Sequence, residues 1–164
     1  VRLEGVVQSV TDRISTLSGA LAGFGEVNVL EQDASEAFWQ DVRDIAMLDE
    51  TAEQVWKLSV APSVVSDVIN MITAQTSIRF FCDWAGGLVM LSGAGDGLNQ
   101  IVRSAVEAHG GGHASLLRAP DTMRAAISSF HPQPAALAGL HDRIRDSFDP
   151  LHLLNPGKMG PALT

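Results

Sequence analysis

The chain has 164 residues, of which 46% are hydrophobic and 18% charged, so it can form a globular domain with a hydrophobic core. Its net charge is −8, from 11 basic and 19 acidic residues. This balance, without any basic run, excludes an ordinary nucleic-acid-binding surface. No apolar stretch is long enough to cross a membrane. Cys82 is the single cysteine, which excludes an internal disulfide and fits a reducing, cytoplasmic compartment.

The first 50 residues predict two strands that alternate with two helices. Residues 1–4 and 26–31 alternate apolar and polar side chains, as half-buried strands do. Apolar residues recur at helical spacing from Val10 to Leu21, and a second helix is predicted to begin at Asp33 with a capping box. Because the chain opens inside a predicted strand and without methionine, we expect it to be a piece of a longer protein.

The middle of the chain, from about residue 55 to about residue 118, predicts the order strand, helix, strand, strand, helix, strand. The two central strands read as a hairpin because two apolar runs meet at Gly86 and Gly87. Ser63 and Asp96 can cap the two helices. The predicted fold class is therefore α+β, a ferredoxin-like (split βαβ) antiparallel sheet with helices packed on one face. The residues predicted to face the core are Trp56, Leu58, Val60, Val65, Val68, Ile69, Ile72, Leu98, Ile101, Val102, Ala105 and Val106.

Two further helices are predicted after Pro120. The second of them, residues 134–148, is expected to bury one apolar face. We therefore divide the chain into an α+β domain, residues 1–119, and C-terminal helices with a tail, residues 120–164. Cys82 is expected to be a buried structural thiol. The tryptophans are assigned to apolar faces, although the one next to the hairpin can instead face a partner: Trp39, Trp56 and Trp84.

Few residues in the body of the chain suggest chemistry. The glycines of residues 92–100 lack the lysine and spacing of a phosphate loop, so a turn before a helix is the better interpretation. His109 and His113 stand four residues apart, but three glycines break the helix between them, so no metal site is predicted. His113 keeps some functional interest because it begins a strand at the end of the sheet, where pockets open.

The tail "SFDPLHLLNPGKMG" (147–160) carries unusually fixed backbone geometry. Pro150 should end the preceding helix at Asp149, and Asn155-Pro156-Gly157 supplies a turn. Three leucines are expected to anchor this segment against the body, and Lys158 is then presented from a stiff loop. By chemistry alone, a well-made C-terminal turn with a solvated lysine explains it.

The tail also resembles a family signature. "FDPLHLLNPGK" (148–158) matches F-D-P-x-x-x-L-N-P-G-K, a C-terminal signature of FAD-linked oxidases in the vanillyl-alcohol-oxidase-like superfamily. The segments "VWKLSVAPS", "FFCDWAGGLVML", "GGHASLLRAP" and "FHPQPAALAGLHDRIRDSFDP" resemble the branch formed by the FAD-binding E subunits of bacterial glycolate oxidases. The resemblance implies that this chain is the C-terminal cap domain, without the N-terminal FAD domain.

The resemblance implies a function and a site. The full-length protein would be an FAD-dependent 2-hydroxy-acid oxidase or dehydrogenase subunit, converting glycolate to glyoxylate together with a second flavoprotein subunit and an iron–sulfur subunit. It would be cytoplasmic, with a peripheral place at the inner membrane through that complex. The flavin would be contacted by Asn155, Gly157 and Lys158, and His113 and Arg118 are candidates for the substrate pocket. The isolated chain is expected to be inactive and not to retain FAD.

One departure from the family leaves the catalytic residues unknown. Relatives that oxidise 2-hydroxy acids carry an H-x-G-D-G-N-x-H type motif, and "GAGDGLN" (93–99) lacks both histidines. Two alternatives therefore stay open. A non-catalytic assembly or interaction module would be favoured by an exposed apolar patch around Phe81 and Trp84, and a standalone small-molecule-binding domain would need an intact pocket.

Overall fold

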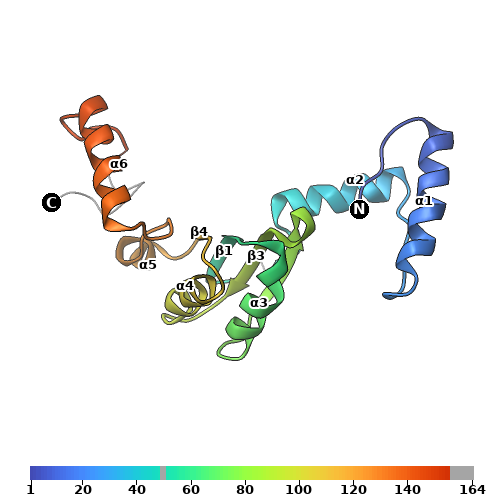
Figure 1. Ribbon diagram of the computed structural model, residues 1–164, viewed down its shortest axis with the longest axis horizontal. Coiled ribbons are helices and arrows are strands. Elements are labelled where there is room, and N and C mark those ends of the chain that lie inside the picture. The colour runs from blue at the N-terminus through green and yellow to red at the C-terminus, as the bar shows by residue number, and fades with distance from the viewer. Residues whose placement is uncertain (49–50, 156–164) are drawn as a thin grey trace. The chain divides into compact units, whose positions relative to one another are not determined.

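The computed structural model describes residues 1–48 and 51–155 (Figure 1). The chain divides into two compact units, Val1–Ala46 and Met47–Thr164. The predicted boundary at residue 119, between an α+β domain and C-terminal helices with a tail, stays a prediction. Each unit is described by itself below.

The first unit consists of two helices, α1 (Val7–Leu21) and α2 (Gln32–Asp44). The two strands predicted at 1–4 and 26–31 are wrong, because both segments are irregular. A strand needs a neighbouring strand for its backbone hydrogen bonds, and the unit provides no ladder for either segment. The predicted capping box is also wrong: α2 begins one residue before Asp33, and its N-cap residue makes no side-chain capping hydrogen bond.

The second unit is built on a four-stranded sheet in the order β2-β3-β1-β4, with every neighbouring pair antiparallel. From β1 to β4 the strands and α-helices follow one another in the predicted order, and the fold class α+β is confirmed. The short helix η2 (Trp84–Gly86) closes the β2–β3 hairpin where the two apolar runs were expected to meet. The strands are β1 (Gln54–Ser59), β2 (Arg79–Asp83), β3 (Leu88–Gly93) and β4 (His113–Arg118).

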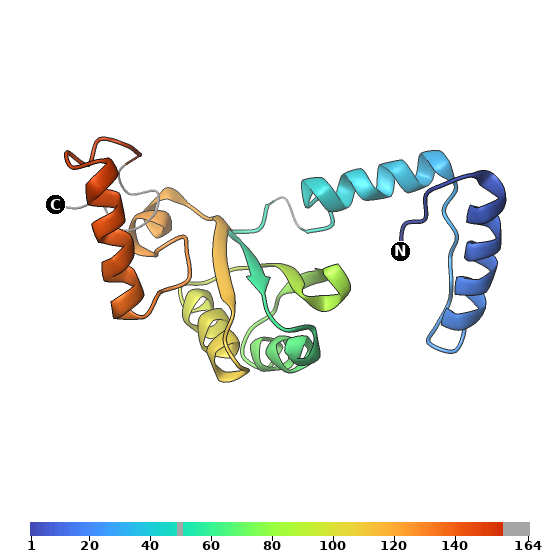
Figure 2. The ribbon, with the colours of Figure 1, turned by 45° about the horizontal axis from the view of Figure 1, so that its top comes forward.

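Two helices cover one face of this sheet, α3 (Val65–Thr73) and α4 (Leu98–Ala108). Figure 2 shows them side by side. Neither predicted cap forms: Ser63 lies inside a short 3₁₀ helix, η1 (Pro62–Val64), and Gly97 rather than Asp96 occupies the N-cap of α4. Within the described residues, no helix has the length and apolar character needed to cross a membrane.

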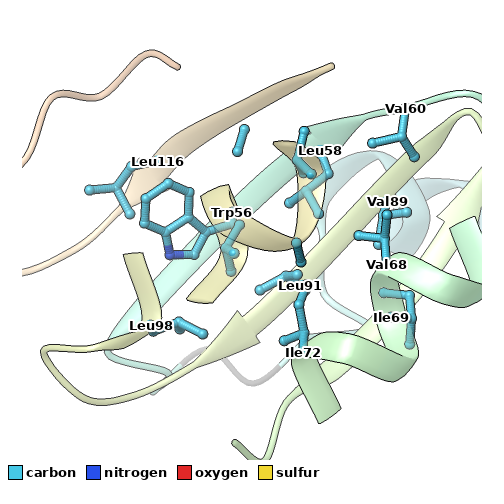
Figure 3. Close-up of a cluster of buried hydrophobic side chains, with 14 residues drawn as sticks. Trp56, Leu58, Val60, Val68, Ile69, Ile72, Val89, Leu91, Leu98 and Leu116 are labelled. Atoms are coloured by element: carbon cyan, nitrogen blue, oxygen red, sulfur yellow. The ribbon is translucent and has the colours of Figure 1, made fainter. Parts of the chain in front are cut away.

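The core lies between this face of the sheet and the two helices. Trp56 and Leu58 of β1 are fully buried, and Figure 3 shows the Trp56 indole among the surrounding aliphatic side chains. Alternate residues of β1, Lys57 and Ser59, are exposed on the other face, as predicted. Val65 and Ile101 are only partly buried; the other predicted core residues are buried.

The C-terminal part contains α5 (Asp121–Ala126) and α6 (Ala135–Phe148). α6 ends directly before Asp149, as the proline predicts. The expected burial of its apolar face is wrong, since no residue of α6 is buried and Phe148 is 85% exposed. The three tail leucines are also exposed: Leu151, Leu153 and Leu154. Periodic apolar residues indicate a helix and its contact face, but they do not identify what covers that face.

β2 forms one edge of the sheet, and its position changes two predictions. Cys82 is exposed rather than buried, because an edge strand has a neighbour on one side only. Partial desolvation raises the pKa of its thiol, so the reactive thiolate is disfavoured. Trp84 is 72% exposed, which leaves it available to a partner, whereas Trp56 lies in the core.

Candidate functional site

The two predicted pocket residues lie at opposite ends of β4. His113 begins the strand and pairs with Ser59 of β1, while Arg118 ends it and pairs with Val55. At about 3.4 Å per residue, five steps separate their Cα atoms by about 17 Å. The structure therefore does not bring His113 and Arg118 into one small site, and their pocket roles stay predictions.

The outer edge of β4 is covered by residues 127–131, which we call the strap. The Leu116 amide donates to Ser129 O at 2.8 Å, and the Ala114 amide donates to Nδ1 of His131 at 3.3 Å. From α4, Arg103 donates to Phe130 O at 3.0 Å, and to Ser128 O as well. The strap thus satisfies backbone donors on an edge that would otherwise be exposed.

Arg103 and His131 are two groups at the strap whose pKa is lowered, in both cases mainly by burial. The Arg103 guanidinium carbon lies 5.4 Å from the centroid of the buried Trp56 ring, a cation–π contact. Nε2 of His131 lies 3.8 Å from a carboxylate oxygen of Glu107. The imidazole rings of His131 and His113 lie edge to face, with 6.2 Å between their centroids. Sequence reasoning missed both residues, because an arginine on a helix and a histidine in a loop carry no motif.

Burial lowers the pKa of His131, and the charges of Arg103 and His113 lower it further, while Glu107 opposes them. The geometry points the same way. A neutral imidazole can accept the Ala114 hydrogen bond at Nδ1, whereas the imidazolium has donors on both nitrogens. Protonation of His131 therefore breaks its hydrogen bond with Ala114, one of the two that join the strap to β4.

We expect acid to destabilise the fold through His131. The pKa of His131 is lower in the folded chain than in the unfolded chain, where it is about 6.5. The contribution of neutral His131 to the free energy of unfolding is therefore fully present above about pH 6.5, and it is lost as the pH falls through the folded-state pKa. The lost hydrogen bond should cost about 1 kcal/mol. His131→Asn keeps an oxygen acceptor for the Ala114 amide but has no ring that titrates. We therefore expect the free energy of unfolding of this variant to fall less between pH 7.5 and pH 5 than that of the unaltered chain, as measured by urea unfolding.

The matched control is His141→Asn at an exposed position of α6, which should keep the pH dependence of the unaltered chain. Equal acid sensitivity of the unaltered chain and His131→Asn would contradict the role of His131.

The two histidines that stand four residues apart lie on different elements, His109 at the end of α4 and His113 at the start of β4. His109 is the C-cap residue of α4, and its Nδ1 lies 2.8 Å from Ala105 O. The three glycines that follow, Gly110–Gly112, all have positive φ and turn the chain into β4, as the sequence predicted. Among the described residues, no group of three or more histidine, cysteine, aspartate or glutamate side chains can hold a metal ion.

The tail has a fixed turn around Asp149. Its two carboxylate oxygens accept hydrogen bonds from the amides of Leu154 (2.8 Å) and Leu153 (3.0 Å). These bonds lower the pKa of Asp149, because they stabilise its ionised form. Asn155 follows with a φ of 48°, while Gly157 and Lys158 lie outside the described residues. The aspartate of the F-D-P segment thus orders the backbone that leads into the predicted flavin-contacting residues.

The first unit contains a pocket of about 380 Å³. None of the predicted site residues lines it. Because α1 and α2 bury no residue of their own, this hollow resembles an unfilled core more than a built ligand site. Most of the residues that line it have apolar side chains, but polar atoms also face it: Val1, Arg2, Leu3, Ile14, Leu17, Ser18, Leu21, Val27, Asn28, Val29, Leu30, Ser35, Phe38 and Trp39.

Comparison with curated proteins finds one similarity of interest. The chain is 28% identical over 160 residues to glycolate oxidase subunit GlcE of Escherichia coli strain K12, covering 97% of this chain. It spans 38% of the length of that protein. No family model matches the chain. No solved structure matches it either, so the ferredoxin-like description of the sheet stays a prediction.

Proposed function

We propose that the chain is the C-terminal cap domain of an FAD-dependent oxidoreductase subunit, in a glycolate oxidase complex that converts glycolate to glyoxylate. The observation that carries the proposal is the similarity to the Escherichia coli glycolate oxidase subunit along nearly the whole chain. The ordered turn at Asp149 supports it, because the signature residues that follow need a defined backbone to reach a cofactor.

The residues of the tail suit one part of the cofactor. The Lys158 ammonium and the Asn155 amide are donors, and donors near N1 and the C2 carbonyl of a flavin stabilise the negative charge of the reduced ring. When bound, FAD supplies the two-electron acceptor for oxidation of the hydroxy acid. The sequence offers no glycine-rich diphosphate loop, so most of the binding energy for FAD would come from a separate domain.

The test is Lys158→Ala in the full-length protein. Loss of a charge-assisted hydrogen bond of about 1.5–3 kcal/mol should lower the two-electron reduction potential by roughly 30–60 mV, or weaken FAD binding to a similar extent. Spectroelectrochemical titration and FAD retention after desalting measure the two effects. Arg124→Ala, which removes an exposed cation from α5, is the matched control. Unchanged potential and unchanged retention in Lys158→Ala would reject the role.

A non-catalytic assembly module is the second candidate, and a specific observation favours it. The β2–β3 hairpin exposes Phe80 and Trp84, at 44% and 72% of their surface, although Phe81 is partly covered. Exposed aromatic side chains next to an open strand edge are typical of contact surfaces. If Lys158→Ala changes neither flavin property, this candidate leads.

A further inference from the structure

The two edges of the sheet differ in whether another segment of the chain covers them. The strap covers the outer edge of β4 with two hydrogen bonds. On the opposite side, β2 ends the sheet. Within residues 1–48 and 51–155, no backbone group of Arg79–Asp83 forms a hydrogen bond to a backbone group outside the sheet. An uncovered edge strand with exposed apolar side chains is a template for pairing with another strand.

The sequence of β2, Arg-Phe-Phe-Cys-Asp, is complementary to itself in charge. Consider two copies whose β2 strands pair antiparallel with the two Phe81 residues opposite each other. In this register Arg79 of each copy lies opposite Asp83 of the other, and Phe80 lies opposite Cys82. Any other antiparallel register moves Arg79 away from Asp83 of the second copy. A parallel in-register arrangement places Arg79 beside Arg79 and Asp83 beside Asp83. Only pairing about Phe81 places both pairs of opposite charges directly across from each other.

The side chains lie where this pairing needs them. Arg79, Phe81 and Asp83 pair with Ser92, Met90 and Leu88 of β3, so the three share the sheet face away from the helices. Opposed residues of antiparallel strands lie about 4.5–5.5 Å apart with side chains on one face, within reach of an ion pair. The side chains of Arg79 and Asp83 still have donor and acceptor atoms that can form this ion pair. Among the described residues, the Arg79 guanidinium donates one long hydrogen bond, to Met47 O at 3.4 Å, and one oxygen of Asp83 accepts from the Trp84 amide at 2.7 Å.

We propose that β2 is a self-association surface, through which two copies of this chain join their sheets by antiparallel pairing about Phe81. The contact is a two-fold, isologous one, in which each copy supplies the same patch. The area of one strand pair is small and each copy carries a charge of −8, so the dimer forms in a concentration-dependent way.

Charge reversal tests the pairing and its register. In a dimer of Arg79→Asp, the new aspartate of each copy lies opposite Asp83 of the other, so acidic residues face each other. In a dimer of Asp83→Arg, the new arginine of each copy lies opposite Arg79 of the other, so basic residues face each other. Each variant should therefore dimerise about tenfold more weakly or worse. A mixture of the two variants restores both pairs of opposite charges, so we expect the mixture to form heterodimers. Sedimentation velocity over a concentration series measures all three samples.

The mixture also separates the proposal from misfolding, because damaged variants would not recover association when combined. Arg124→Asp, away from β2, should dimerise like the unaltered chain. Three results would overturn the proposal: a monomeric unaltered chain at every concentration, dimers that persist in both single variants, or single variants that associate no better together than apart. Occupation of the β2 edge by a strand of a different protein would overturn it as well.

Discussion

Replacing Trp56 by alanine is expected to lower the free energy of unfolding by about 3–5 kcal/mol. The side chain is fully buried on a central strand, between β3 and β4, and belongs to the core shared by the sheet, α3 and α4. Its loss removes a large apolar volume that the neighbouring side chains cannot refill. Urea unfolding monitored by far-ultraviolet circular dichroism gives the change.

Polar contacts add to the cost of losing Trp56. The indole Nε1 donates to Oε1 of Gln54 at 3.1 Å, and Gln54, itself fully buried, donates to Gly95 O at 2.8 Å. Without the indole, a buried acceptor loses its donor, and Arg103 loses the ring against which it lies. Trp56→Phe keeps most of the volume but not the donor, so it should cost about 1–2 kcal/mol.

The matched control for Trp56→Ala is Trp84→Ala. This side chain is 72% exposed on the hairpin, so its removal should change the stability of the single chain by about 0.5 kcal/mol or less. Comparable losses from the two substitutions would contradict the core described for the second unit.

Gly112→Ala is expected to destabilise the chain by about 2–4 kcal/mol. Gly112 has a φ of 142°, which an L-residue rarely adopts, and a Cβ at this position would overlap the carbonyl oxygen of Ser59. It would also lie 3.2 Å from Cγ1 of Val60. The backbone must therefore move where β4 begins, directly before His113. Urea unfolding measures the loss.

Gly111→Ala separates conformational strain from the collision. Gly111 also has a positive φ, 83°, but a Cβ there meets nothing within 4 Å. Its substitution should cost about 1 kcal/mol. If Gly111→Ala and Gly112→Ala prove equally destabilising, the close approach of Gly112 to β1 is not the cause.

Much of the second unit could be predicted from local patterns. Alternation identified β1 together with its buried face, and the two glycines after Trp84 marked the hairpin between β2 and β3. The glycines after His109 marked the passage from α4 into β4. These features are encoded within short segments, because side-chain periodicity and glycine conformations depend on few neighbours.

The candidate site was less predictable. The tail signature was visible in the sequence, and so was the turn, but the two hydrogen bonds that Asp149 accepts appear only in the structure. Arg103 and His131 were missed altogether, since Arg103 contacts the strap from α4 while His131 belongs to the strap, 28 residues further along the chain. Contacts of this kind arise from packing and leave no spacing that a motif can express.

The sequence by itself determined where most helices and strands of residues 54–148 lie and which strand face meets the core. Only the tertiary structure decided which strands form the edges of the sheet, which edge is covered, and that the apolar face of α6 stays exposed. The same limit explains the failure at residues 1–4 and 26–31: alternation prepares a segment for a sheet, but a strand exists only where another strand accepts its hydrogen bonds.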